Sequence, residues 1–246
     1  MSTNLWKKTT VMLGVALVVF LFNLPAHLVG GKLYTLSGQR VCVFNTSGTV
    51  WSGQAQIGLS NGHECKAVPN PLTWHLVALD SDSWLGIRFD HSALIHPAQL
   101  GLSAEGVHLN ASELQLPASW LSALGAPFNT IRPEGVLHIN WARVNVLNPD
   151  LKIEIRWRDA QSALASIRPL GDYLLSLNGH AGKQINLKLD TLNGPLNLQG
   201  QGVLQPGQRV QFQGYAWPSE NSRAALTGLL SQMGQQDGQR YRLGVF

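Results

Sequence analysis

Strict alternation of apolar and polar residues is the feature that most constrains how this chain can fold. In the clearest run, apolar residues at every second position alternate with charged ones: Leu151, Ile153, Ile155 and Trp157 against Lys152, Glu154 and Arg156. Because successive side chains of a strand point to opposite faces, this pattern predicts a strand with one buried and one solvated face. The same period recurs over Leu72–Leu76, Leu137–Trp141, Ile185–Leu189, Leu196–Leu198 and Val210–Phe212. Such strands are typical of antiparallel sheets, so we predict a mainly β protein with a curved, antiparallel sheet.

Turn-forming residues separate these runs, and the helices between them are expected to be few and short. Asn, Gly and Pro punctuate the chain at residues 148–150, 178–180, 193–195 and 205–207, as turns require. Proline at a first helical turn, serine as a helix cap and glycine after a last turn mark the helix ends. Short helices are therefore predicted over Pro117–Leu124, Ala160–Ile167 and Ser219–Met233.

Charged residues make up only 13% of the chain, about half of the share usual in soluble domains. Lys and Arg number 18 against 14 Asp and Glu, a formal net charge of +4. The basic residues are scattered along the sequence. Nucleic-acid binding requires a patch of cations that neutralises phosphates, so the charge pattern argues against nucleic acid as a partner.

An apolar segment near the N-terminus predicts a transmembrane helix. Residues 11–24 contain no charged residue. A helix over residues 10–29 would be about 30 Å long, which matches the hydrocarbon core of a bilayer. Lys7 and Lys8 precede it and no basic residue follows before Lys32. This asymmetry predicts a cytoplasmic N-terminus and therefore a single-pass protein of the inner membrane of a Gram-negative cell.

A cleaved signal peptide is the alternative interpretation of the same segment. A cleavage site needs small residues at alternate positions, and His27 and Leu28 fit that requirement poorly. We therefore expect an uncleaved anchor, with residues 1–9 in the cytoplasm. Under both interpretations residues 30–246 are exported to the periplasm.

The chain contains two cysteines, Cys42 and Cys65. In an oxidising compartment an isolated pair is most simply a disulfide. Closing a loop of about two dozen residues would stabilise the fold by roughly 3–3.5 kcal/mol, with the turn at residues 60–62 joining the two strands. A metal site of His63 and Cys65 is the alternative, but no second ligand pair follows at a zinc spacing, and no metal or cofactor is expected.

Catalytic chemistry has no sequence signature in this chain, which predicts that it is not an enzyme. The eight His residues, at 27, 63, 75, 91, 96, 108, 138 and 180, form no metal-binding pair on a helix. Asp80 and Asp82 suggest a calcium loop, but no Glu completes it, and an Asp/Ser turn explains them better. A phosphate-binding glycine loop and a nucleophile elbow are both missing.

Eight tryptophans are many for a chain of this length. Trp51, Trp141 and Trp157 occupy the apolar phase of predicted strands and are expected in the core. Trp217, within Tyr-Ala-Trp-Pro, is the best candidate for a contact with another protein, because tryptophan is enriched at interface hot spots.

Two segments of similar pattern suggest an internal duplication. Gly48–Ala55 and Gly135–Ala142 are both Gly-led apolar strands that precede a spacer and a partner strand. The exported part is thus expected to contain two similar halves, residues 33–124 and 131–246.

Several of these features together resemble the protein N family of the bacterial type II, or general, secretion pathway. The resemblance rests on the basic N-terminus with its anchor, on Leu116-Pro117-Ala118 with Pro133–Leu137 and Trp141, on Trp157–Leu164, on Thr191–Leu196, and on motif residues Gly48, Thr49, Trp51, Gly53, Pro169, Leu170, Gly171, Tyr173, Gly194 and Pro195. It spans nearly the whole chain in the expected order.

This resemblance implies an accessory inner-membrane component of a machine that exports folded proteins. The implied partners are other subunits of that machine and the membrane itself, and the family brings with it no enzyme activity, cofactor or small-molecule substrate. The Gly48–Gly53 segment also resembles AsmA-like envelope proteins, whose grooved sheets are associated with lipids. A lipid-handling module is therefore the alternative function.

Overall fold

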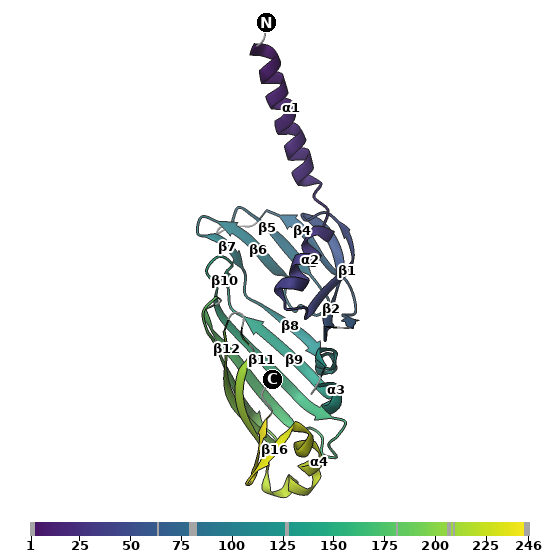
Figure 1. Cartoon of the computed structure of the whole chain (residues 1–246), viewed down its shortest axis with the longest axis vertical. Coiled ribbons are helices and arrows are strands. Elements are labelled where there is room, and N and C mark those ends of the chain that lie inside the picture. Colours follow the sequence, from purple (N-terminus) through teal and green to yellow (C-terminus); the bar gives the residue numbers. More distant parts are fainter. Residues whose placement is uncertain are drawn as a thin grey trace.

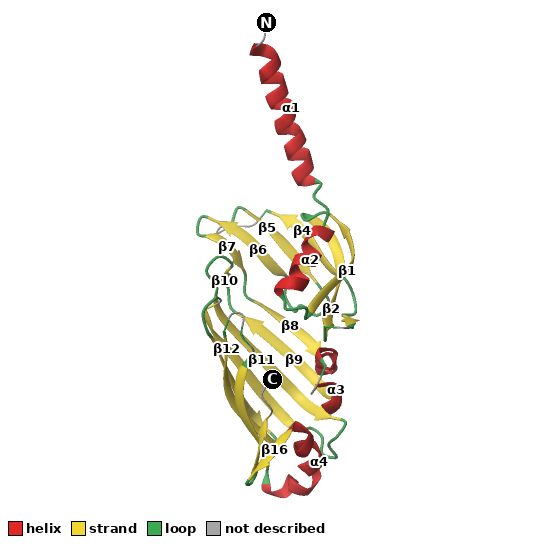
Figure 2. Cartoon of the chain, in the orientation of Figure 1, coloured by secondary structure: helices red, strands yellow, loops and turns green. Residues whose placement is uncertain are grey.

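The computed structural model describes residues 3–62, 64–78, 83–125, 128–180, 182–205, 208 and 210–243. Helix α1 (Thr3–Phe22) projects away from two antiparallel sheets that follow one another along the long axis of the molecule (Figure 1). Figure 2 shows how few and short the remaining helices are. The predicted mainly β, antiparallel fold is confirmed, and it consists of two sheets.

The first sheet has eight strands in the order β1-β2-β4-β5-β6-β7-β10, with β3 paired to β2. Their bounds are β1 Val41–Gly48, β2 Ser52–Ser60, β3 Cys65–Ala67, β4 Leu72–Val77, β5 Leu85–Asp90, β6 Ala98–Ser103, β7 Gly106–Leu109 and β10 Val144–Asn145. Helix α2 (His27–Leu36) lies against this sheet and leads directly into β1.

The second sheet has nine strands in the order β16-β17-β15-β14-β13-β12-β11-β9-β8. Their bounds are β8 Ser112–Pro117, β9 Pro133–Trp141, β11 Asp150–Ser162, β12 Gly171–His180, β13 Ile185–Asn193, β14 Leu196–Leu204, β15 Gln211–Pro218, β16 Gly234–Asp237 and β17 Arg240–Leu243. Strands β8, β9 and β11 to β15 pair antiparallel in chain order, with residues 118–132 between β8 and β9 and with β10 between β9 and β11. This connectivity follows from the turn residues that separate the predicted strands.

The two sheets are joined at several points. Strand β8 belongs to the second sheet although it lies in the first predicted half, residues 33–124, whereas β10, in the second half, pairs with β7 of the first sheet. The Ile95 N–H donates to the Glu113 carbonyl oxygen (2.9 Å), and Arg40 Nη1 donates to the Leu124 carbonyl oxygen (3.2 Å). The similarity of the two predicted halves stays a prediction.

Two of the three predicted helices are present, and one is replaced by a strand. A 3-10 helix, η1 (Ala118–Leu124), follows Pro117 as expected, and the third predicted helix is η2 (Glu220–Ser222) continued by α4 (Arg223–Met233). The predicted helix over Ala160–Ile167 is wrong, because β11 continues to Ser162. Ala160 pairs with Gly171 on one side and Gln161 with Glu134 on the other. Two neighbouring strands thus outweigh the helical preference of Ala160–Ile167.

Two further boundaries differ from the predictions. Residues 178–180 do not form a turn but end β12. The predicted anchor, residues 10–29, is not one continuous helix. Helix α1 ends at Phe22, Pro25 follows, and α2 begins at His27. A proline after a helix is a common stop because it cannot donate to the preceding turn. Short α3 (Phe128–Ile131) completes the list of helices in the described ranges.

Among the residues that the structure describes, no helix is both long and apolar enough to cross a membrane.

The predicted disulfide is confirmed. Cys42 in β1 and Cys65 at the start of β3 are bonded, with their Cα atoms 6.5 Å apart and 23 residues apart in sequence. Both strands pair with β2, so the two sulfur atoms lie over Gly58 of that strand. A side chain at Gly58 would displace them, which explains the glycine.

The tightly packed core lies at one end of the second sheet, under α4. Leu226, Leu229 and Leu230 of this helix are at most 1% exposed. They pack with Leu196, Leu198 and Ala216 of strands β14 and β15. The apolar stripe predicted for this helix is therefore the part of the sequence that closes the core.

Candidate functional site

An open apolar groove runs along one face of the second sheet. It encloses about 1440 Å³. Its walls are mainly aliphatic and aromatic: Leu121, Phe128, Ile131, Leu137, Ile139, Ile155, Trp157, Tyr173, Leu175, Ile185, Leu187, Leu189, Leu198, Leu204, Val210, Phe212, Met233 and Leu243. We refer to this feature as the groove.

The walls of the groove are the apolar faces that the alternation predicts. In β11, Ile155 and Trp157 point into it, whereas Lys152, Glu154 and Arg156 on the opposite face are exposed. Strand register carries the apolar face from strand to strand, since Ile155 pairs with Ile139 on β9 and with Leu175 on β12. Most of these side chains are only half-buried. The apolar face is therefore closed by α4 at one end and left open along the rest.

Glycines widen one wall of the groove. The row of paired residues that crosses the sheet through Leu175 and Leu189 continues through Gly200 of β14 and Gly214 of β15. The ring of Phe212 lies across this small-residue surface, and a Cβ at Gly202 would be 2.9 Å from it. Larger residues at these positions would push the Phe212 ring into the groove. The glycines therefore leave the groove wider along this wall.

Polar residues of the groove come from three connecting segments. They are Gly182 and Lys183 between β12 and β13, Gln205 and Gln208 between β14 and β15, and Ser37, Gly38 and Arg40 between α2 and β1. The first two segments lie at the same end of their strands, because Gly179 pairs with Ile185 and Ile185 pairs with Leu204. We refer to these polar residues as the rim.

The first motif of the sequence analysis, Gly48–Gly53, holds the end of α1. The Val50 N–H donates to the Leu24 carbonyl oxygen (2.9 Å), and the Ala26 N–H donates to the Gly48 carbonyl oxygen (3.2 Å). The Trp51 Nε1–H donates to the Leu21 carbonyl oxygen (2.8 Å), and its ring lies 6.2 Å from that of Phe22. We call Gly48–Gly53 the clasp.

The motif residues of the clasp have distinct structural roles. Gly48 has a φ of +88°, a region that glycine enters without strain. The Thr49 hydroxyl oxygen accepts from the N–H groups of Trp51 (3.3 Å) and Ser52 (3.2 Å). A Cβ at Gly53 would be 2.8 Å from the Trp74 ring. Trp51, predicted in the core, is instead a half-buried contact to the helix end.

Trp141 and Trp157 are also half-buried rather than enclosed in the core. The Trp141 Nε1–H donates to the Asn110 carbonyl oxygen (2.9 Å), and the Trp157 Nε1–H donates to that of Glu134 (2.9 Å). Each ring therefore packs on the sheet while its polar edge binds a carbonyl of a neighbouring segment.

The second motif block brings residues from two hairpins together beside the core. The Leu196 N–H donates to the Leu170 carbonyl oxygen (3.1 Å), and the Tyr173 hydroxyl lies 3.1 Å and 2.9 Å from the carbonyl oxygens of Leu170 and Leu196. Gly194, with a φ of +119°, lies against Gly171. We call Pro169–Tyr173 with Gly194 and Pro195 the lock.

Further contacts tie the lock to its surroundings. Both Asp172 carboxylate oxygens accept hydrogen bonds, from the Asp159 N–H (2.8 Å) and from Asn193 Nδ2 (2.9 Å). The Pro195 carbonyl oxygen accepts from the Ser219 N–H (2.7 Å), just before η2. The second motif block is therefore a structural joint between the sheet and the segment that carries α4.

Burial, and secondarily the charge of Asp172, raises the pKa of Tyr173 above its ordinary range. The neutral phenol is thus favoured in the folded state, which stabilises the fold below about pH 10, the ordinary tyrosine pKa, and stabilises it less as the pH rises further. Tyr173→Phe should cost about 0.5–1.5 kcal/mol near neutral pH. Urea unfolding should show less alkaline destabilisation in this variant than in the wild type. An equal loss of stability in both proteins at alkaline pH would contradict this role.

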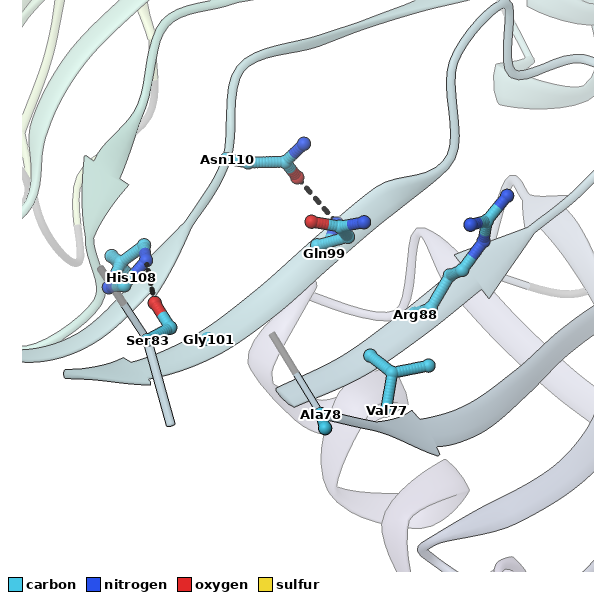
Figure 3. Close-up of a pocket in the computed structure, with 8 residues that line it drawn as sticks. All are labelled: Val77, Ala78, Ser83, Arg88, Gln99, Gly101, His108 and Asn110. Carbon is cyan, nitrogen blue, oxygen red and sulfur yellow. Dashed lines mark hydrogen bonds between the residues drawn. The ribbon is translucent and has the colours of Figure 1, made fainter. Parts of the chain in front are cut away.

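A small polar pocket of about 380 Å³ lies on the first sheet (Figure 3). The Ser83 hydroxyl is 3.0 Å from His108 Nε2, and the Asn110 side chain accepts from the Gln99 N–H. No carboxylate is among the described residues that line this pocket. Among the described lining residues, the Ser–His pair thus has no acid of the kind that orients the histidine in a catalytic triad. Its members lie 25 residues apart, and sequence reasoning missed them.

The metal alternatives of the sequence analysis fall on residues outside the described part of the chain. His63, Asp80 and Asp82 all lie there. In the described ranges, His, Cys, Asp and Glu side chains form no group of three or more that could hold a metal ion.

An exposed apolar patch at one end of the first sheet was not predicted. Its residues are Trp84 (72% exposed), Leu85, Leu102, Val146 and Leu147 (77% exposed). They are neighbours, since Leu85 pairs with Leu102, the Trp84 N–H donates to the Leu102 carbonyl oxygen (3.0 Å), and the Val146 N–H donates to that of Val107 (2.8 Å). Neighbouring exposed apolar side chains are typical of interaction surfaces. We call these five residues the patch.

Trp217, the tryptophan singled out for a protein contact, is half-buried. Its ring stacks under Arg240, whose Cζ atom lies 4.7 Å from the ring centroid. This cation–π contact joins β15 to β17.

Comparisons with known proteins agree with the resemblance found in the sequence. Residues 39–244 match the family model for type II secretion system (T2SS), protein N. The chain is 30% identical over 233 residues to the type II secretion system protein N of Klebsiella pneumoniae, a match that covers 89% of this chain and 86% of that protein. No solved structure matches the chain.

Proposed function

Since this chain belongs to the type II secretion system protein N family and is thus a component of that machinery, we propose that it is a non-enzymatic accessory subunit of the inner membrane. In this proposal α1 lies in the bilayer with its N-terminus in the cytoplasm. The two sheets lie in the periplasm, where they contact other subunits.

The exposed apolar surface of α1 supports the anchor. Large apolar side chains between Val11 and Phe22 are exposed, among them Leu13 (73% exposed) and Phe20 (64% exposed). A bilayer would cover this surface, and Lys7 and Lys8 would remain at the cytoplasmic face. The disulfide fits the oxidising periplasm.

The clasp connects the anchor rigidly to the first sheet. Hydrogen bonds from Val50, Ala26 and Trp51 join the first sheet to the end of α1. The sheet is therefore fixed at the membrane surface rather than tethered by a free linker. These hydrogen bonds would hold the patch at a defined distance from the bilayer, where a neighbouring subunit can contact it.

A complementation experiment tests this proposal. Deleting the gene from its native host, in a background without a paralogue, should reduce release of type II substrates into the medium, and the wild-type gene should restore it. The double variant Trp84→Ser/Leu147→Ser should fail to restore release, whereas Leu192→Ser, which alters a leucine of comparable exposure (55%) on β13, should succeed. Normal release in the deletion strain would count against the proposal.

The anchor is tested separately by a variant in which residues 1–29 are replaced with a cleavable secretory signal. That protein should reach the periplasm, remain soluble and fail to support secretion. Full activity of the soluble form would contradict a need for the anchor.

A second candidate function is a lipid-handling module of the AsmA-like kind. The open groove is the observation that favours it, because a sheet used only as a scaffold has no need of an uncovered apolar face.

A further inference from the structure

We propose that the groove holds the acyl chains of an anionic membrane phospholipid, with the phosphate at the rim near Lys183. This inference rests on the lipid-handling candidate function above and names its ligand, and the proposed membrane anchorage enters only as the source of the lipid.

The size and lining of the groove suit hydrocarbon chains. Its volume of about 1440 Å³ exceeds the roughly 300–1,000 Å³ typical of pockets for drug-sized molecules. Along the walls, half-buried residues such as Ile155, Leu187 and Leu189 present methyl groups and no hydrogen-bonding group. An acyl chain would cover this surface without leaving a polar group unpaired.

The backbone of the walls argues against an added peptide strand. Strands β12, β13 and β14 are interior strands that pair on both sides. Their N–H and C=O groups are used in the sheet, so a strand laid along the groove would find no backbone partner there. Peptide strands instead add to free sheet edges, and a buried unpaired backbone is costly. A hydrocarbon chain carries no such requirement.

The charge at the rim selects the head group. The ionised side chains of the groove are Arg40 and Lys183, and no carboxylate is among the described residues that line it. Gln205 and Gln208, which come from the turn at the same end of the strands as Lys183, add hydrogen-bonding groups. The opposite end of the groove is filled by the core under α4. An amphiphile therefore fits in one orientation, with its anionic head at the rim and its tails toward α4.

Photo-crosslinking in intact cells tests the occupant. The probe p-benzoylphenylalanine replaces Leu187 in the full-length protein, and mass spectrometry identifies what is attached to the peptide that contains it after irradiation. We expect the mass of a phospholipid. The same probe at Asn186, which is exposed on the outer face of β13, is the matched control and should give no lipid adduct.

A probe at Val15 of α1 separates this inference from the proposed anchor. Lipid adducts at Val15 but not at Leu187 would overturn the groove assignment and leave the anchor standing. Adducts at Leu187 alone would support the groove and overturn the anchor. A polypeptide attached at Leu187 would show that another protein occupies the groove and would overturn the lipid proposal.

Charge reversal at the rim tests the head group. Combined with the Leu187 probe, Lys183→Glu should lower the yield of anionic phospholipid adducts about fivefold or more, the effect expected for one cation near a phosphate. Lys188→Glu, on the outer face of β13, should leave the yield unchanged. An unchanged yield with Lys183→Glu would overturn the assignment of the phosphate to this rim.

Discussion

Replacing Gly194 with alanine should destabilise the folded protein by about 3 kcal/mol or more, which is large for a change of one methyl group. Gly194 has a φ of +119°, a conformation that costs other residues strain. A Cβ there would also be 2.6 Å from the Leu170 carbonyl oxygen. The two hairpins of the lock would have to separate, which would break the hydrogen bond from the Leu196 N–H to the same oxygen.

A second glycine provides the control. Gly238, in the turn between β16 and β17, also has a positive φ (+61°), but a Cβ there would meet nothing within 4 Å. Gly238→Ala should therefore cost only the backbone strain, about 1–2 kcal/mol. Chemical denaturation of both variants measures the difference. Equal destabilisation would mean that the close approach in the lock contributes nothing.

Loss of the disulfide should have a comparable effect, about 3–3.5 kcal/mol, because the bond joins two residues that lie 23 positions apart in the unfolded chain. Reduction frees β3, a strand of three exposed residues whose pairing is to β2 alone. Urea unfolding with and without a thiol reductant measures this contribution. The double variant Cys42→Ser/Cys65→Ser should match the reduced wild type and should not respond to reductant. A change below about 1 kcal/mol in both comparisons would contradict the prediction.

The disulfide has a consequence beyond stability. Cys42 follows Arg40 by two residues, and Arg40 contributes both to the rim and to the contact with Leu124 between the sheets. By holding the start of β1 against the adjacent strands, the bond positions this arginine.

Much of the fold was predictable because its information is local. The alternation in residues 151–157 identified both the strand and the face that turns inward. Pro117 correctly marked the start of η1, and the leucines at 226, 229 and 230 identified the buried side of α4. The cysteine pair followed from the expected compartment.

Features that depend on distant neighbours were missed. Ala160 extends a strand rather than starting a helix, because Gly171 and the β9 strand pair with that segment. The patch could not be foreseen, since Trp84, Leu102 and Leu147 meet only through strand pairing and loop packing. Trp51 lies in the apolar phase of a predicted strand and was expected in the core, but its side chain instead contacts the end of α1.

The sequence by itself determined the period-two faces, the disulfide partners, the apolar N-terminal segment and the family, because each is written in residues that lie close together or in a fixed order. The tertiary structure alone decided what covers those faces. Whether an apolar strand face becomes a closed core or an open groove depends on whether another element reaches it. Here α4 reaches only one end of the second sheet, and the remainder stays open.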